Sequence, residues 1–192
     1  CGTVDMKRLP VANIAGPTGP PACIASADIA FDADFEYFSL PGLGSVLAVE
    51  ADINSIMNAV EFIYRRDCEI AYNITTIIVR TSEPDPYNTT GFGTLINEFR
   101  DFWNLTYCAA CPTPIDRAVA HMFTGKDIDP GAGGVIGIAY SLDGICTDQA
   151  YAISESRFST TYSSRVRLTA HEPGHNWSAN HCTCPGWTMN SV

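Results

Sequence analysis

Three histidines and one glutamate in the stretch 171–181 carry the strongest chemical signal in the sequence. His171 and His175 are four residues apart, and side chains at this spacing lie on one face of a helix, so both imidazoles can reach one metal ion. Glu172 follows the first histidine, and from there its carboxylate can reach a water molecule on that metal. The segment His-Glu-Pro-Gly-His is thus an HExxH motif, and it predicts a zinc ion with a base beside it.

His181 comes six residues after His175, so the chain has to leave the helix and turn back to deliver it. Three nitrogen ligands leave the fourth tetrahedral position of zinc open, which is typical of a catalytic site. Because the whole chain has only 4 histidines, a chance placement of three of them here is a weak alternative. A closed structural site that uses Cys182 or Cys184 is another, but cysteines of a secreted chain more often form disulfides. We therefore expect all three histidines to bind zinc.

The composition limits the class of protein. The 192 residues suffice for one hydrophobic core, and 46% hydrophobic with 17% charged residues fits a globular domain rather than a disordered chain. A formal net charge of −10 argues against binding to nucleic acid or to an anionic membrane, because both need a basic surface. No apolar run approaches the roughly 20 residues of a membrane span. These numbers favour neither a nucleic-acid-binding nor a membrane-spanning protein.

Cysteines and glycosylation motifs indicate an oxidising, extracellular environment. The 8 cysteines are even in number and allow several disulfide pairings, whereas so many free thiols are uncommon in a cytosolic protein. Asn-X-Ser/Thr motifs at Asn73, Asn88 and Asn104 are candidate glycosylation sites. A fourth motif, at Asn176, adjoins His175, where a glycan would crowd the metal site. We therefore predict a secreted glycoprotein.

Hydrophobic periodicity predicts an alternation of strands and helices. The predicted strands are 26–38, 69–81, 117–123, 135–140 and 150–155, and the predicted helices are 47–66, 92–106 and one that begins near Ser163 or Ser164 and runs through His175. This order predicts an α/β fold, a mixed twisted sheet of about five strands with packed helices. Residues 1–24, rich in proline and glycine, are expected to form an irregular arm, a remnant of a propeptide, and residues 25–192 the catalytic domain.

The metal motif resembles that of the metzincin metalloproteases, HExxHxxGxxH followed by a turn that contains methionine. Met189 stands where the family has this methionine, which lies under the zinc site without binding the metal. The chain resembles the adamalysin or reprolysin branch over most of 26–189. Residues 32–38 are similar to the first strand of that branch, and residues 118–140 to the segment that leads into its edge strand. The resemblance implies a metzincin fold, with the zinc helix near the C-terminus and a short Met-turn tail after it.

The resemblance also implies a zinc endopeptidase that hydrolyses peptide bonds with a zinc-activated water. Glu172 would take the proton of this water and pass it to the leaving amine. A protein or peptide substrate would lie extended along the edge strand and pair with its backbone. The residues of this strand are Val135, Ile136, Gly137, Ile138, Ala139 and Tyr140. Cys1 is placed like the cysteine switch of reprolysin propeptides, whose thiolate caps the zinc, and a disulfide to a partner such as Cys23 explains it equally well.

Three features depart from the family pattern. Pro173 stands inside the zinc helix, where it has no N–H for the carbonyl of Thr169 and disfavours a regular helix by about 3 kcal/mol. Ser178 replaces the motif glycine and is strained if the turn needs a positive φ. The sequence also stops three residues after Met189, whereas the family continues into another helix. A second hypothesis therefore stays open, a catalytically weak or inactive metzincin-fold domain that serves as an extracellular structural or binding protein, with self-association among its roles.

Other polar residues have simpler explanations. Asp32, Asp34 and Glu36 alternate along the first predicted strand. Some reprolysins bind calcium, and such acids would suit it, but alternating acids on a strand usually form a solvated face. Calcium is therefore a second candidate cofactor besides zinc, but the sequence does not support it. His121 lies in an apolar strand, so we expect a core histidine with a hydrogen bond rather than a metal ligand.

Overall fold

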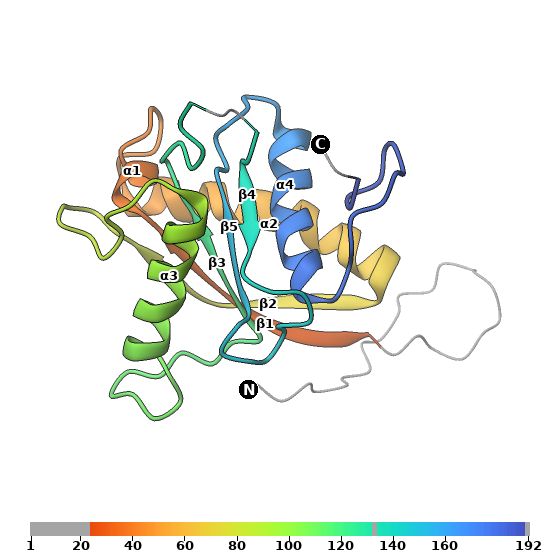
Figure 1. Cartoon of the computed structure of the whole chain (residues 1–192), viewed down its shortest axis with the longest axis horizontal. Coiled ribbons are helices and arrows are strands. Elements are labelled where there is room, and N and C mark those ends of the chain that lie inside the picture. The colour runs from red at the N-terminus through yellow and green to blue at the C-terminus, as the bar shows by residue number, and fades with distance from the viewer. Residues whose placement is uncertain (1–23, 132–133, 191–192) are drawn as a thin grey trace.

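A computed structural model of the chain describes residues 24–131 and 134–190 (Figure 1). The centre of this part is a five-stranded sheet in the order β2-β1-β3-β5-β4. The strands are β1 (Ala25–Ala33), β2 (Ile70–Val79), β3 (Val119–Phe123), β4 (Gly137–Ala139) and β5 (Tyr151–Ser154). Neighbouring strands are parallel except for β4, which runs antiparallel to β5 at one edge. The expected α/β fold with a mixed sheet is confirmed.

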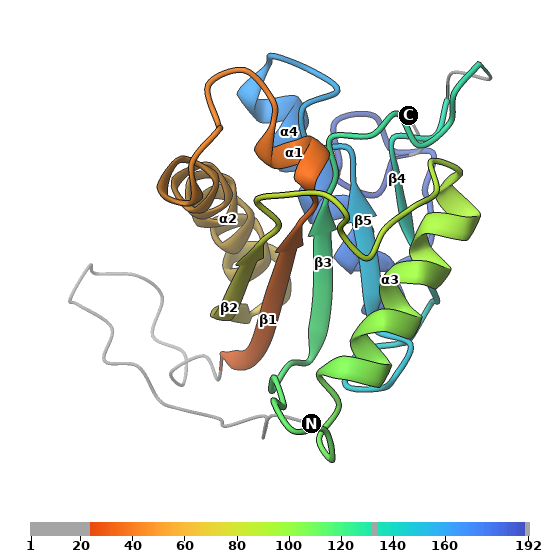
Figure 2. The ribbon, with the colours of Figure 1, turned by 90° about the vertical axis from the view of Figure 1, so that its left-hand side faces the viewer.

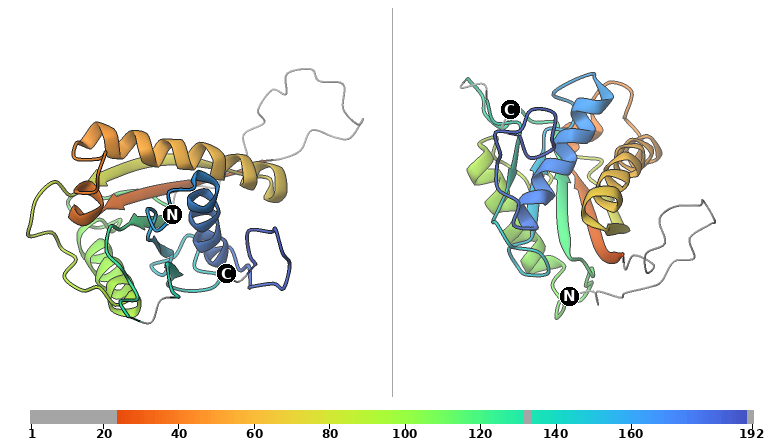
Figure 3. Two further views of the ribbon diagram at one scale, coloured as in Figure 1. Left: turned by 90° about the horizontal axis from the view of Figure 1, so that it is seen from above. Right: turned by 90° about the vertical axis from the view of Figure 1, so that its right-hand side faces the viewer.

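Helices cover both faces of the sheet (Figures 2 and 3). They are α1 (Phe35–Phe38), α2 (Val46–Cys68), α3 (Phe92–Thr106) and α4 (Tyr162–Asn176). The long helix α2 and the zinc helix α4 pack on one face, and α3 packs on the other against β4 and β5. Successive residues of β1 separate the two cores, since Ile29 belongs to the core under α2 and Ala30 to the core under α3. The sheet thus holds α4 and β4 beside each other at one edge.

The helix α2 forms where apolar residues recur at helical spacing and a serine caps the start. The side chain of Ser45 accepts a hydrogen bond from the backbone N–H of Ala48 (3.2 Å) and satisfies one of the donors that a helix start leaves open. The apolar stripe is fully buried and contains Val49, Ile53, Ile56, Met57 and Val60. Burying this stripe stabilises the helix and fixes the face on which α4 packs.

The first predicted strand is too long, because its acidic half forms a helix instead. β1 ends at Ala33, and Asp34 caps α1 by accepting a hydrogen bond from the N–H of Tyr37 (2.7 Å). Asp32 and Asp34 are fully buried rather than solvated. Asp32 forms an ion pair with Arg80 (2.7 Å). Asp34 is therefore a buried helix cap and Asp32 belongs to a buried ion pair. The prediction that these acids form a solvated face was wrong.

The remaining boundaries differ from the prediction by a few residues. α4 begins after Thr161 rather than at a capping serine, and Ser163 and Ser164 lie in its first turn. Regular pairing of β4 is confined to 137–139, although Ile136 and Tyr140 still bond to β5 or the residue after it. Within the described ranges, no helix is both long and apolar enough to cross a membrane. The division of the chain at residue 24 stays a prediction, because residues 1–23 lie outside the described part.

Candidate metal centre and active-site cleft

The three predicted zinc ligands converge at the end of α4. The Nε2 atoms of His171 and His181 are 3.0 Å apart, those of His175 and His171 are 3.1 Å apart, and those of His175 and His181 are 3.2 Å apart. Zinc with Zn–N bonds of about 2.0–2.1 Å places tetrahedral nitrogen ligands roughly 3.3 Å from one another. The spacing therefore fits a zinc ion capped by three imidazoles.

The other ring nitrogens of His171 and His175 leave the Nε2 atoms of these two residues free to bind a metal ion. His171 Nδ1 lies 2.7 Å from the carbonyl oxygen of Thr188, and His175 Nδ1 lies 2.7 Å from that of Ala179. A carbonyl oxygen only accepts, so each Nδ1 carries the hydrogen and each Nε2 keeps a lone pair. Burial also lowers the pKa of both histidines and favours their neutral form. Adjacent lone pairs without hydrogens between them repel, and a metal ion removes that repulsion.

The loop after α4 brings the third histidine and the methionine under the helix. Ser178 leaves the helix with φ 70°, in the left-handed region that the motif glycine favours, so the predicted strain is present. The loop returns beneath the helix, where a Cβ added to Gly174 would lie 2.7 Å from the sulfur of Met189. Met189 thus packs directly against the HExxH segment. Its role as the methionine of a Met-turn stays a prediction.

Glu172 lies in the wall of the same centre, against the edge strand. A Cβ added to Gly137 would lie 2.4 Å from Glu172 Oε1, so only glycine lets the carboxylate approach β4 this closely. The residue is 5% exposed, and among the described residues none donates a hydrogen bond to its carboxylate. Burial raises the pKa of Glu172 to about 8. A carboxyl group whose pKa lies near neutral pH can both accept and release a proton, as an acid–base catalyst must.

A cleft of about 410 Å³ opens between β4 and α4, and the three histidines are among the residues that line it. Its walls include the predicted substrate residues Val135, Ile136, Gly137, Ile138 and Ala139, together with Leu168 and Glu172. Tyr140 continues the strand and donates its N–H to the carbonyl of Tyr151 (2.8 Å), but it is not among the residues that line the cleft. The cleft therefore adjoins a sheet edge, the geometry in which an extended peptide can pair with a strand.

Cys182 and Cys184, which follow His181 in the sequence, are paired with each other and not available as metal ligands. Cys182 forms a disulfide with Cys184, and Cys108 forms one with Cys111. This favours the three-histidine site over a closed site with cysteine ligands. Cys1, the predicted cysteine switch, and Cys23, its alternative disulfide partner, lie outside the described residues.

The four Asn-X-Ser/Thr motifs differ in accessibility. Asn73 and Asn88 are exposed. The amide group of Asn104 donates to the carbonyl of Asp148 (3.0 Å) and accepts from the hydroxyl of Tyr151 (2.6 Å), so a glycan would break these contacts. Asn176, whose use was doubted, is fully buried and bonds to the backbone. Glycosylation stays a prediction, with Asn73 and Asn88 as its most accessible sites.

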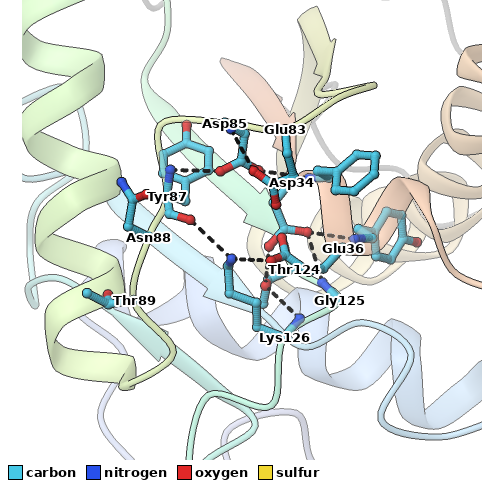
Figure 4. A network of polar contacts seen from close by, with 12 residues as sticks. Asp34, Glu36, Glu83, Asp85, Tyr87, Asn88, Thr89, Thr124, Gly125 and Lys126 are labelled. Atoms are coloured by element: carbon cyan, nitrogen blue, oxygen red, sulfur yellow. Dashed lines mark hydrogen bonds and ion pairs between the residues drawn. The ribbon is translucent and has the colours of Figure 1, made fainter.

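A second acidic group lies at the opposite end of β1 from Ala25, where Figure 4 shows Glu36, Glu83 and Asp85 close together. Each carboxylate has a structural role. Asp85 accepts hydrogen bonds from the N–H groups of Phe35 (2.9 Å) and Tyr87 (2.8 Å), and Glu83 accepts one from the N–H of Asp85. The ammonium of Lys126 pairs with Glu36 and supplies the positive charge that a cation would bring. The described residues therefore give no support to calcium.

His121 is a core histidine, as its apolar surroundings predict. It is fully buried, and its Nε2 lies 2.9 Å from the hydroxyl of Ser154. Burial lowers its pKa to about 3, so the ring is neutral. Two contacts that orient His171 and His175 cannot be predicted from the sequence. Thr188 and Ala179 act through backbone carbonyls, which every residue type has, so no pattern could have revealed them.

The fold and the centre together define a metallopeptidase of the metzincin type. A family model described as metallopeptidase family M12B, reprolysin-like, matches residues 50–182, which include all three histidines. The chain therefore belongs to the reprolysin-like metallopeptidases of family M12B. No curated protein matches it by sequence.

Solved structures support the same fold. Metalloproteinase-II from Bacteroides fragilis is 18% identical with a TM-score of 0.56, over 91% of this chain and 48% of that chain. A chain in the structure of a chaperone–substrate complex is 13% identical with a TM-score of 0.56, over 83% of this chain and 25% of that chain. The chain thus spans about half or less of the length of these similar structures. At such low identity the likeness concerns the fold alone.

Proposed function

We propose that the protein is a secreted zinc endopeptidase that hydrolyses peptide bonds of protein or peptide substrates. One observation carries the proposal: the convergent Nε2 atoms of three histidines lie in a cleft beside a buried glutamate and a sheet edge. A structural zinc site needs neither the open cleft nor the base. The cysteine pairs and the accessible sequons support secretion.

The residues of the chain suggest how each step proceeds. His171, His175 and His181 would hold zinc, which supplies Lewis acidity to the scissile carbonyl and makes water a better nucleophile. A substrate backbone would pair with β4, and this pairing would place the scissile bond over the histidines. Glu172 takes a proton from the attacking water and delivers it to the leaving amine. Burial brings the pKa of Glu172 closer to neutral pH, which suits a group that first accepts and then releases a proton.

Cleavage of an internally quenched peptide by the wild type and by Glu172→Ala tests the proposal. Loss of a general base lowers kcat by about 10²–10⁴-fold, and a zinc chelator should abolish the wild-type rate. The variant keeps all three ligands, so bound zinc measured by metal analysis should be unchanged. Equal and chelator-insensitive rates for both proteins would reject the peptidase and favour the second hypothesis, an inactive extracellular binding or structural domain.

A further inference from the structure

An arginine in the wall of the cleft has no acidic partner among the residues that the structure describes. Arg167 stands on α4 one turn before His171 and lines the cleft. Seven of the nine cationic side chains in the described ranges pair with a carboxylate; they are Arg65, Arg66, Arg80, Arg100, Lys126, Arg157 and Arg165. An eighth, Arg117, lies over the rings of Trp103 and Tyr151. Arg167 differs from all of them, although the chain has a net charge of −10 and offers many acids.

The hydrogen bonds of Arg167 leave most of its guanidinium unused. Its Nη2 donates to the carbonyl oxygen of Asn190 at 3.2 Å. Its Nε is buried and has no partner among the described residues. Its Nη1 has no hydrogen bond to a described residue either, and it is not buried. A guanidinium has five N–H donors in a planar fork, so the donors that Asn190 leaves unused can bind a carboxylate in the cleft.

The surroundings of Arg167 strengthen such a contact. The neighbouring walls are apolar and include Val135, Ile136, Ile138, Phe158 and Leu168. An ion pair is stronger beside apolar surface than in water, because the surroundings screen it less. Glu172 is the one acid among the residues that line the cleft, and it lies against Gly137 of β4 without an ion pair to Arg167. The positive charge is therefore available to a bound molecule.

We propose that Arg167 selects peptide substrates with an aspartate or glutamate side chain close to the scissile bond. The proposal rests on the proposed peptidase function and names the substrate class of that site. Residues four apart on a helix are neighbours, so Arg167 and His171 project from adjacent turns of α4. A substrate whose scissile bond lies at the histidines thus places one of its nearest side chains within reach of the guanidinium.

Pairs of internally quenched peptides test this selection. The two peptides of a pair differ only in having Glu or Gln at one position, and successive pairs place that residue at each position next to the cleaved bond. Glutamine has the shape of glutamate without its charge. A charge-assisted hydrogen bond in such a site corresponds to about tenfold or more in kcat/KM. We expect this preference for Glu at one position, its loss in Arg167→Met, and its reversal towards Lys over Gln in Arg167→Glu. Arg65→Met, which removes one positive charge outside the cleft, should keep the preference.

A binding measurement separates this inference from the peptidase function. Fluorescence anisotropy with the zinc-loaded Glu172→Ala protein measures the affinity for the same peptides, labelled with a fluorophore, without turnover. Tighter binding of the Glu peptide supports the inference even if the wild type cleaves neither peptide. The melting temperature of each Arg167 variant shows that it is folded. Equal kcat/KM and equal affinity for the Glu and Gln peptides at every position would overturn the inference about Arg167. Cleavage of these peptides would still support the peptidase function. A preference that Arg167→Met retains would overturn it as well.

Discussion

The contact between Gly137 and Glu172 gives a sharp prediction about the general base. A Cβ at residue 137 would lie 2.4 Å from Oε1 and 2.8 Å from Cδ of Glu172, whereas ordinary van der Waals contact begins at 3.4 Å. In Gly137→Ala the carboxylate therefore has to retreat by roughly 1 Å, the difference between these distances. The side chain can move because its carboxylate end is flexible, so we expect the variant to fold.

The expected effect is on catalysis and not on the metal. A catalytic group misplaced by about 1 Å can lower the rate on the order of 10²-fold, so kcat/KM of Gly137→Ala should fall by that factor, chiefly through kcat. The three atoms nearest to the new methyl group belong to Glu172 and Leu168, and none of them belongs to His171, His175 or His181. The zinc content should therefore equal that of the wild type. The neighbouring side chain of Leu168, 2.8 Å from the new Cβ, also has to shift.

Two matched variants make the test specific. Gly93→Ala adds a methyl group where no atom lies within 4 Å, so it should leave kcat/KM unchanged. Glu172→Asp shortens the base by one methylene, and combined with Gly137→Ala it should recover part of the lost rate, although alone it lowers the rate. A Gly137→Ala protein with wild-type zinc content, wild-type melting temperature and at least half the wild-type kcat/KM would refute the positioning argument.

Three further predictions concern stability. Ser178→Gly relieves the left-handed backbone at φ 70° and should raise the free energy of unfolding by about 1 kcal/mol in a denaturant titration; an unchanged or lower value would show that serine is not strained. Burial lowers the pKa of His121 to about 3, below its unfolded value of 6.5, so the wild type is fully stabilised above pH 6.5 and loses about 2 kcal/mol by pH 5 as the unfolded chain takes up a proton. The stability deficit of His121→Gln should therefore shrink over this range, and parallel pH profiles would contradict a neutral folded ring. Zinc at 100 times its Kd should stabilise the wild type by about 2.7 kcal/mol, and a similar rise in His171→Ala would place the ion elsewhere.

The convergence of the three histidines could be predicted from the sequence because two of them lie on one helix. The spacing of His171 and His175 decides their relative position through helix geometry alone. The apolar spacing in α2 and α3 likewise reports directly which face of each helix is buried. Local periodicity is sufficient wherever a function or a core depends on residues of a single element.

Contacts between elements that are distant in the sequence could not be predicted from it. The approach of Gly137 to Glu172 depends on how the sheet edge packs on α4, and no local pattern encodes it. The acids of β1 gave a wrong prediction for the same reason. Alternation places Asp32 on the opposite face from Phe31. Its burial depends on three donors from other parts of the chain, which are Arg80 directly after β2, Tyr87 in the loop that follows and Trp103 in α3. Only the assembled fold supplies the donors that make a buried carboxylate stable.

The same dependence on distant contacts explains how the centre tolerates Pro173. Proline leaves the carbonyl of Thr169 without its helical donor, yet α4 continues to Asn176. The hydroxyl of Tyr64 on α2 donates to the next carbonyl, that of Ala170, at 2.8 Å and braces the helix where proline weakens it. The imidazoles are held by carbonyls of the following loop rather than by the helix alone. The ligand geometry thus depends on α2 and the Met-turn loop as much as on the local helix, so a residue that is unfavourable in an isolated helix does not by itself imply a disrupted metal site.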